Sequence, residues 1–315
     1  MTVTETARWL LAHDNYLILT HIRPDGDTLG CAAGLCAALR KAGKNAALLP
    51  NPGVTSTYAD YVAPYLAPEG YSHDTVVSVD IATTGLFPNN ARAYADCVDL
   101  AIDHHPSYEG FSRESCVDHT LAACGELIYA ICLELGQMDS EIALPLYVAV
   151  STDTGCFVYS NTSPNTHRVA AALMEYGDFY RSVNKRCFRT KSRARLMLES
   201  MIMAGMEFHD GGAIAIAAIS SEMMTKACAG EADAEDLAAF PGQIEGVRVS
   251  ATLRELDKGK TKISLRTDAS LNATRTCALL GGGGHVAASG ATVDLPLEQA
   301  KQAILNAIRQ IQQEQ

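Results

Sequence analysis

The stretch HIRPDGDTLG at residues 21–30 directly follows the apolar run YLILT at residues 16–20. The apolar run predicts a buried β-strand. Residues 27–42 then predict a helix that begins near Asp27 and ends before Gly43, because acidic residues favour a helix start and glycine favours its end. The opening of the chain is therefore a strand that passes through a polar loop into a helix.

The same alternation continues through the first half of the chain. Residues 75–80 (TVVSVD) and 97–103 (CVDLAID) predict two further strands. Residues 121–135, 143–150 and 164–176 predict helices. Strands that alternate with helices are typical of an α/β protein whose parallel sheet is covered on both faces.

The pattern changes near residue 191. Residues 192–206 predict a connecting helix rich in Met, Leu and Arg, and residues 297–311 predict an amphipathic helix. Strand-like segments lie between them, at residues 212–219, 246–253 and 260–266.

These patterns predict an α/β chain with two domains and a helical linker. We expect a parallel-sheet domain at residues 1–187, a linker at 188–210, and a smaller α/β domain with a mixed sheet at 211–315.

The composition excludes several classes of protein. The 315 residues carry a net charge of −11, so a basic footprint for long duplex DNA is not expected. No apolar stretch approaches the roughly 20 residues of a membrane span, and the N-terminus lacks the pattern of a secretory signal. None of the ten cysteines forms a CxxC pair. We therefore expect a cytoplasmic protein with reduced thiols.

Acidic and histidine side chains gather where the predicted strands of the first half end. They follow three strands and also occur in STDTG at residues 151–155, where a turn is expected: His21, Asp25, Asp27, Asp80, Asp103, His104, His105 and Asp153. In open α/β sheets, ligands bind beyond the carboxyl ends of the strands. A single Asp after a strand is usually a helix cap, but four such segments together indicate one shared site.

Six of these side chains form a set of oxygen and imidazole ligands: His21, Asp25, Asp27, Asp80, His104 and Asp153. Such ligands suit Mn²⁺ or Mg²⁺. Four neighbouring carboxylates would repel one another, and bound divalent cations would remove that repulsion. Two such ions can also bind a bridging water, lower its pKa and clamp phosphoryl oxygens.

Five motifs in order resemble a known family. HIRPDGDTLG (21–30), VDIA (79–82), IDHHP (102–106) and STDTG (151–155) resemble the four motifs of the DHH phosphoesterase superfamily. GGGGHVAASG (281–290) is similar to the glycine-rich signature of the DHHA1 domain. The compact length resembles the NrnA group of nano-RNases, which also dephosphorylate 3′-phosphoadenosine 5′-phosphate (pAp).

The resemblance implies a role for each metal ligand. His21 and Asp25 would hold one ion, and Asp27, His104 and Asp153 would hold the other. These roles come from the family motifs and not from the spacing of the residues.

The resemblance also implies which residues take part in catalysis. Asp80 would bridge the two ions, Asp103 would orient the motif histidines, and His105 would face the phosphate as a hydrogen-bond donor or general acid. Two departures concern the substrate: Tyr108 stands where many relatives have Asn, and no Arg follows Asp80 closely.

The second domain is expected to hold the nucleotide. Its four successive glycines permit close backbone approach to a ligand. If the strands at 246–253 and 260–266 pair, their alternation presents a face with Lys, Arg, Ser and Thr, although a solvated sheet face would look similar. The candidate substrate-binding residues are Arg254, Ser264, Arg266, Gly282, Gly283, Gly284 and His285.

The resemblance implies hydrolysis of short oligoribonucleotides to nucleoside 5′-monophosphates, of pAp to AMP, or of both. The implied cofactors are two divalent ions, Mn²⁺ first and Mg²⁺ as the alternative. Substrate would lie between the two domains, and a homodimer would be compatible with the family. The rival substrates are cyclic di-AMP and pApA; a non-catalytic nucleotide sensor and an inorganic pyrophosphatase rank lower.

Overall fold

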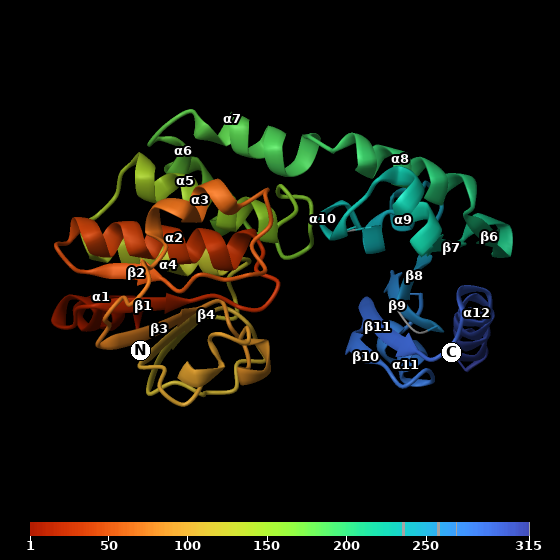
Figure 1. The fold of residues 1–315 in the computed structure, drawn as a ribbon, viewed down its shortest axis with the longest axis horizontal. Helices are drawn as coiled ribbons and strands as arrows, with labels where there is room; N and C mark the ends of the chain where they lie inside the picture. Colours follow the sequence, from red (N-terminus) through yellow and green to blue (C-terminus); the bar gives the residue numbers. More distant parts are fainter. Residues whose placement is uncertain (235–236, 257–258, 269, 315) are drawn as a thin grey trace. The chain divides into compact units, whose positions relative to one another are not determined.

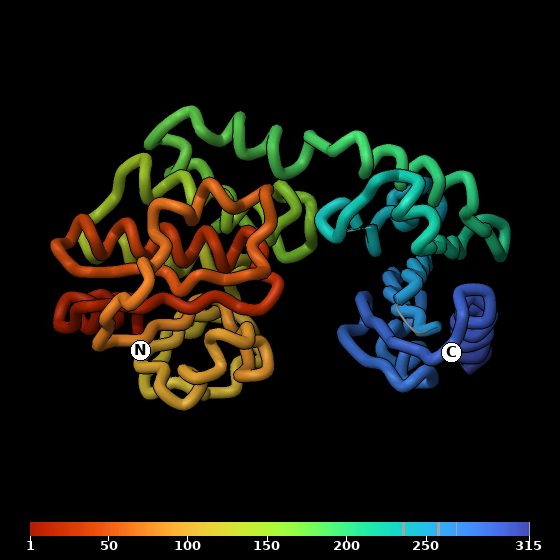
Figure 2. Tube along the Cα trace, in the orientation of Figure 1, coloured from red at the N-terminus to blue at the C-terminus, as the bar shows by residue number. Residues whose placement is uncertain are grey.

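The computed structural model describes residues 1–234, 237–256, 259–268 and 270–314. The chain divides into two compact units, Met1–Thr190 and Lys191–Gln315 (Figures 1 and 2). The linker that we predict at residues 188–210 remains a prediction about how the units are joined.

The first unit is built on a parallel sheet. Within the described residues it has five strands in the order β2-β1-β3-β4-β5. The strands are β1 (Tyr16–Leu19), β2 (Ala46–Leu48), β3 (Thr75–Val79), β4 (Leu100–Asp103) and β5 (Glu114–Val117). Because β2 and β3 lie on opposite sides of β1, the strand order reverses between β1 and β3. In sheets of this order, the carboxyl ends at such a switch point form the ligand crevice.

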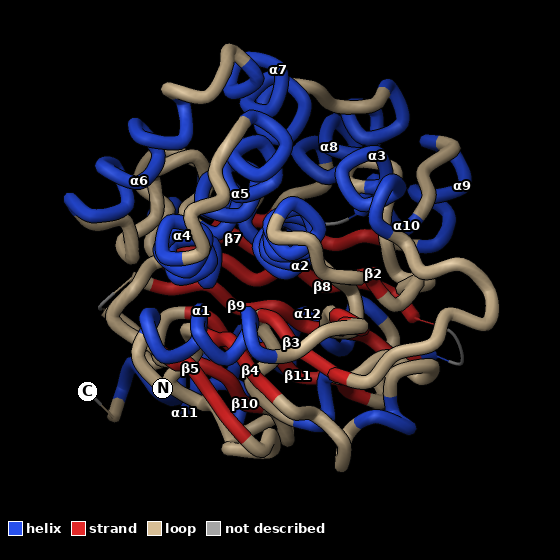
Figure 3. The backbone as a smooth tube through the Cα atoms, turned by 90° about the vertical axis from the view of Figure 1, so that its left-hand side faces the viewer, coloured by secondary structure: helices blue, strands red, loops and turns tan. Residues whose placement is uncertain are grey.

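Helices cover one face of this sheet (Figure 3). Four of them carry the larger hydrophobic core with the inward residues of the strands: α1 (Val3–Ala12), α2 (Gly26–Lys41), α4 (Cys124–Glu134) and α5 (Ser140–Asp153). The other face is covered by loops and short 3₁₀ turns around Phe87, Ala91 and Tyr94. The expectation of helices on both faces is therefore wrong, because the connections after β2 and β3 are rich in Pro, Gly and Asn and do not form long helices.

Helices α2 and α5 approach each other through glycines. Cβ atoms added at Gly26 and Gly30 would lie 2.2 Å from Thr152 Oγ1 and 2.2 Å from the Pro145 carbonyl oxygen. Gly34 meets Leu146 in the same way. Since no larger residue fits at these positions, the glycines bring the end of α5 beside the start of α2.

Helices also follow α5. They are α6 (Pro164–Met174), the short α7 (Phe179–Asn184) and a π-helical turn (Lys185–Arg189). A short helix, α3 (Ala59–Val62), follows β2.

The second unit is built on a mixed sheet. Its described residues form six strands in the order β10-β11-β9-β8-β7-β6, of which only the β7–β8 pair is parallel. The strands are β6 (Glu207–His209), β7 (Ile214–Ile219), β8 (Val249–Leu256), β9 (Lys260–Thr267), β10 (Gly283–His285) and β11 (Ala288–Val293). The predicted α/β class, with a parallel and a mixed sheet, is confirmed.

Helices pack on both faces of this mixed sheet. Helices α11 (Ala273–Ala278) and α12 (Leu297–Gln313) form a core with β8 and β9. Helices α8 (Arg193–Ala204) and α9 (Ser221–Ala227) belong to a second cluster with β7. In the described part of the chain, no helix is long and apolar enough to cross a membrane.

Candidate metal centre

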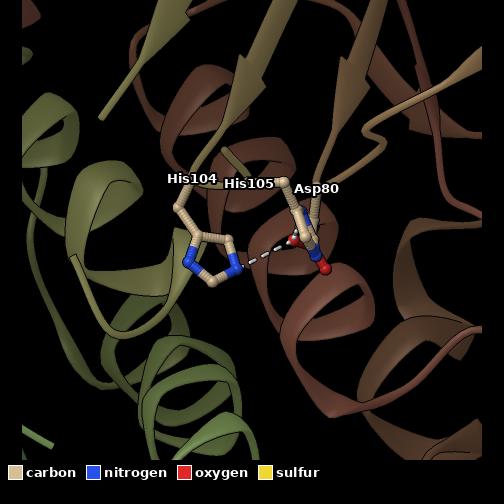
Figure 4. A group of neighbouring side chains, drawn as sticks. All are labelled: Asp80, His104 and His105. Atoms are coloured by element: carbon tan, nitrogen blue, oxygen red, sulfur yellow. Dashed lines mark ion pairs between the residues drawn. The ribbon is translucent and has the colours of Figure 1, made fainter. Parts of the chain in front are cut away.

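The polar cluster lies at the switch point of the parallel sheet. Asp80 directly follows β3, with a left-handed φ of 57° and its amide bonded to the Ile102 carbonyl at 2.9 Å. Asp25 caps the N-terminus of α2, and Asp103 is the last residue of β4. Figure 4 shows the His104 imidazole directed at the Asp80 carboxylate, with His105 beside it.

The structure brings together all six predicted metal ligands. Their ligand atoms fall into groups in which all atoms lie within 4.8 Å of one another: His21, Asp25 and Asp80; Asp27, His104 and Asp153; and Asp80, His104 and His105. Asp80 faces both histidines, with Oδ2 3.7 Å from His21 Nε2 and Oδ1 3.5 Å from His104 Nε2. Asp80 thus belongs to two of these groups, and its two carboxylate oxygens face different histidines.

Two candidate ligand histidines, His21 and His104, are held in one tautomer by backbone carbonyls. His21 Nδ1 donates to the Ile22 carbonyl at 2.9 Å, and His104 Nδ1 donates to the Leu121 carbonyl at 3.2 Å. Because a carbonyl oxygen only accepts, the proton is on Nδ1 in each ring. Nε2 therefore presents its lone pair to the carboxylates, as metal-binding histidines do.

Asp27 is fixed by the N-terminus of α4. Its Oδ2 accepts from the Cys124 amide at 2.7 Å, and its Oδ1 accepts from the Gly125 amide at 2.9 Å. The Cys31 thiol also donates to Oδ1, at 3.2 Å. The carboxylate is thus oriented before any ion binds.

The electrostatics of the cluster fit divalent cations. Burial, together with the charge of Asp25, raises the pKa of Asp27 to about 6, and burial with the charge of Asp27 raises that of Asp153 to about 7. Burial and Asp27 also raise the pKa of Asp80 well above its usual value. Among the described residues, buried Asp80 Oδ1 has no hydrogen-bond partner. Cations would supply the missing partner and relieve the repulsion.

His105 is oriented by Asp103. Its Nδ1 lies 2.8 Å from Asp103 Oδ1, which also accepts from the backbone amides of His104 and His105 at 2.7 and 3.2 Å. This hydrogen bond raises the pKa of His105. The side chain is 40% exposed, and Nε2 is the nitrogen that can reach a substrate.

Asp153 reaches the cluster differently from the sequence expectation. The sequence predicts a turn at Asp153, but in the structure Asp153 is the last residue of α5 and Thr154 is the C-cap. The helix continues through Ser151 and Thr152 because its close contact with α2 extends to Gly26. One of the four converging segments is thus a helix end.

Asn51 is a residue that the sequence analysis missed. Its Nδ2 donates to Thr20 Oγ1 and to the His21 carbonyl, both at 2.9 Å, and thereby fixes the loop that carries His21. The only local signal was the turn sequence NPG after the three-residue strand β2, which does not distinguish a supporting Asn from an ordinary turn residue.

In the second unit, sheet register aligns several candidate substrate-binding residues. Arg266 on β9 pairs with Ala288 on β11, which pairs with His285 on β10. A second row lies two residues further along each strand and consists of Ser264, Gly290 and Gly283. Residues in such rows project from the same face of the sheet.

The glycine-rich segment is an edge strand rather than a loop alone. Gly283 has open space where a side chain would be, whereas a Cβ on Gly282 would lie 2.1 Å from the Gly290 carbonyl oxygen. Gly284 has a φ of 141°. Glycine is therefore required for close packing at Gly282 and for backbone conformation at Gly284.

Fewer basic and hydroxyl side chains are exposed on the predicted sheet face than its sequence pattern suggests. Strands β8 and β9 do pair, with Arg254 opposite Lys262. However, Ser250 and Thr252 are buried, and Thr252 Oγ1 donates to the Leu237 carbonyl at 3.3 Å, because the segment at 237–243 covers them. Arg254 is also ion-paired with Glu231.

Comparison with family models finds two matches in this chain. The DHH family, N-terminal domain, matches residues 15–150, and the DHHA1 domain matches residues 212–314.

Curated proteins and a solved structure resemble nearly the whole chain. The "Bifunctional oligoribonuclease and PAP phosphatase NrnA" of Thermus thermophilus is 33% identical over 93% of this chain and 89% of that protein. The protein of the same name from Bacillus subtilis is 25% identical over 92% and 93%. An exopolyphosphatase-related protein from Bacteroides fragilis has the same fold, with a TM-score of 0.88, 23% identity and coverage of 98% and 96%.

Proposed function

Since this chain belongs to the DHH family and carries a DHHA1 domain, we propose that it hydrolyses short oligoribonucleotides to nucleoside 5′-monophosphates and pAp to AMP. It is a hydrolase acting on phosphoester bonds. The observation that carries the proposal is the convergence of three Asp/His groups at the switch point, in a chain similar along its length to oligoribonuclease and PAP phosphatase proteins.

The residues of the centre divide into ligands and proton-handling groups. His21 and Asp25 would hold one ion, Asp27, His104 and Asp153 would hold the other, and Asp80 would bridge them. Bound ions would activate water and neutralise the phosphoryl oxygens. His105, oriented by Asp103, would donate a hydrogen bond or proton to a phosphate oxygen.

Mn²⁺ is the metal that we propose, with Mg²⁺ as the alternative. Mg²⁺ is usually bound through one or two carboxylates and keeps several waters. Here four carboxylates and two imidazoles with free Nε2 lone pairs face the centre. Imidazole ligands favour transition metals over Mg²⁺.

We propose that residues 211–315 bind the nucleotide, with residues 1–187 as the catalytic domain and 188–210 as the linker. Arg266 and His285, which share a row of the mixed sheet, would bind phosphate or base away from the reacting phosphorus, together with Arg254, Ser264 and the backbone of Gly282–Gly284. The net charge of −11 disfavours long duplex DNA as a partner. A homodimer is also proposed, and sedimentation velocity tests it.

A turnover panel tests the function. The purified chain with Mn²⁺ is given pAp, RNAs of two to five nucleotides, pApA and cyclic di-AMP. We expect turnover of pAp and of the short RNAs. Turnover confined to cyclic di-AMP or pApA would contradict the assigned substrate, and binding without turnover of any of them would indicate a sensor instead of an enzyme.

A further inference from the structure

A short loop leaves the metal centre and returns to it. It begins after Asp153 and continues to Asn161, whose Nδ2 donates to the Asp153 carbonyl at 3.1 Å and to the Ala122 carbonyl at 3.0 Å. Both ends of the loop are therefore tied to the residue that contributes one candidate metal ligand. The loop therefore follows directly on a residue of the candidate metal centre.

The backbone of the loop is strained. Gly155, Cys156 and Phe157 have left-handed φ angles of 55°, 57° and 67° in succession. Left-handed conformations are unfavourable for residues other than glycine and concentrate at functional sites. The Phe157 side chain anchors the loop by stacking on His167, with ring centroids 5.2 Å apart.

In this conformation the Tyr159 side chain is exposed and packs on its own loop. The side chain is 57% exposed, yet its ring packs on Gly155, where an added Cβ would lie 2.5 Å from the Tyr159 ring. Val158 beside it is 80% exposed. Single exposed hydrophobic residues are ordinary, but here two adjacent ones lie on a strained loop that begins at a candidate metal ligand.

We propose that the Tyr159 ring stacks on the substrate base nearest the scissile phosphate, so that the enzyme prefers nucleotides to other phosphoesters. The proposal rests on the proposed function. Aromatic rings bind bases of every identity because each base has a π-face, which suits an enzyme for short RNAs of mixed sequence. A ring already held against Gly155 loses little freedom when a base binds.

The test compares two substrates and three variants. The substrates are a 5′-phosphorylated diadenylate and its analogue that lacks the base next to the scissile phosphate. The variants are Tyr159→Ala, Tyr159→Phe and, as a matched control, Tyr176→Ala, since Tyr176 is an exposed tyrosine elsewhere in the first unit. We expect Tyr159→Ala to lower kcat/KM for the diadenylate by about 10-fold, with little change for the abasic analogue.

Tyr159→Phe and Tyr176→Ala should retain the preference for the base. The stacking role would be overturned if Tyr159→Ala lowered kcat/KM equally for both substrates. It would also be overturned if Tyr159→Phe lowered kcat/KM for the diadenylate as much as Tyr159→Ala does. Turnover of neither substrate by the unaltered chain would overturn the proposed function instead. In that case quenching of a bound 2-aminopurine dinucleotide still decides the inference: quenching lost only in Tyr159→Ala supports it, and unchanged quenching overturns it.

Discussion

The metal centre of the first unit and the glycine-rich edge of the second are both candidate sites, but they are built differently. At the metal centre, Asp27 is held by two backbone amides and His21 by a carbonyl. The carboxylates of Asp27, Asp80 and Asp103 are buried. At the edge, His285 is exposed and Gly283 has no neighbour where a side chain would be.

The proposed division of labour between the two units agrees with this difference. Ligands that must hold ions in one geometry are fixed by hydrogen bonds from neighbouring elements. Groups that bind nucleotides of varied base and length can remain exposed, because their contacts form with the substrate. Damage to the first site should therefore abolish all chemistry, whereas damage to the second should affect only substrates that reach it.

The largest effect is expected for Asp80→Ala. This change removes a ligand from both candidate ions, so kcat/KM with Mn²⁺ should fall by roughly 10³-fold or more on every phosphoester. The measurement is turnover of pAp and of bis-p-nitrophenyl phosphate, together with bound metal by elemental analysis. Asp96→Ala is the control, since Asp96 is exposed outside the cluster. Retained activity in Asp80→Ala would exclude the bridging role.

Asp103→Ala should have a smaller effect at the same site. Asp103 contacts His105 and two backbone amides and is not among the candidate metal groups. Losing such a supporting contact typically costs about 10–100-fold. We expect this loss in kcat with nearly normal metal content. A variant that has lost its metal would show instead that Asp103 supports the ions themselves.

Arg266→Ala and His285→Ala should separate the two regions. Turnover of pAp or of a dinucleotide should fall by about 10-fold or more, the scale of one lost charge-assisted contact. Bis-p-nitrophenyl phosphate has no second phosphate or base and should be hydrolysed almost normally.

Asp27→Ala is the contrasting control, because it should lose both activities. The kcat/KM of each variant is measured on both substrates after folding and metal content are verified. If the second-unit variants lose both activities equally, their residues support the fold or the metal site, and the division of labour is wrong.

The smallest effect on turnover is expected for Asn51→Ala. Without its two hydrogen bonds to Thr20 and His21, the His21 loop is less well positioned. Mn²⁺ should bind about 10-fold more weakly, while kcat at saturating Mn²⁺ stays near normal. The measurement is a titration of activity with Mn²⁺. If the Mn²⁺ concentration that gives half-maximal activity is unchanged in Asn51→Ala, the role of Asn51 is limited to its turn.

The sequence predicted those features that depend on local patterns. The run at residues 16–20 and the polar loop after it became β1 and the start of α2, and the ligands after β1, β3 and β4 were correctly expected near one another. Strand alternation also predicted that Arg266 and Ser264 share a face.

Features that depend on packing between distant segments were not predictable in this way. Asp153 lies on a helix end because α5 packs against the glycines of α2. Thr252 is buried because residues 237–243 fold over its strand. Asn51 supports the His21 loop because the loop after β2 packs beside the loop after β1, and a local sequence pattern does not reveal this contact.

Metal dependence tests the central claim most directly. The chain is stripped with excess chelator, dialysed, and titrated with Mn²⁺ while pAp turnover and bound metal are measured together. We predict that the stripped chain is inactive, and that activity returns and reaches a plateau at about two ions per chain. Full activity in excess chelator would contradict a metal-dependent mechanism, and a plateau at one ion would contradict the two-ion centre.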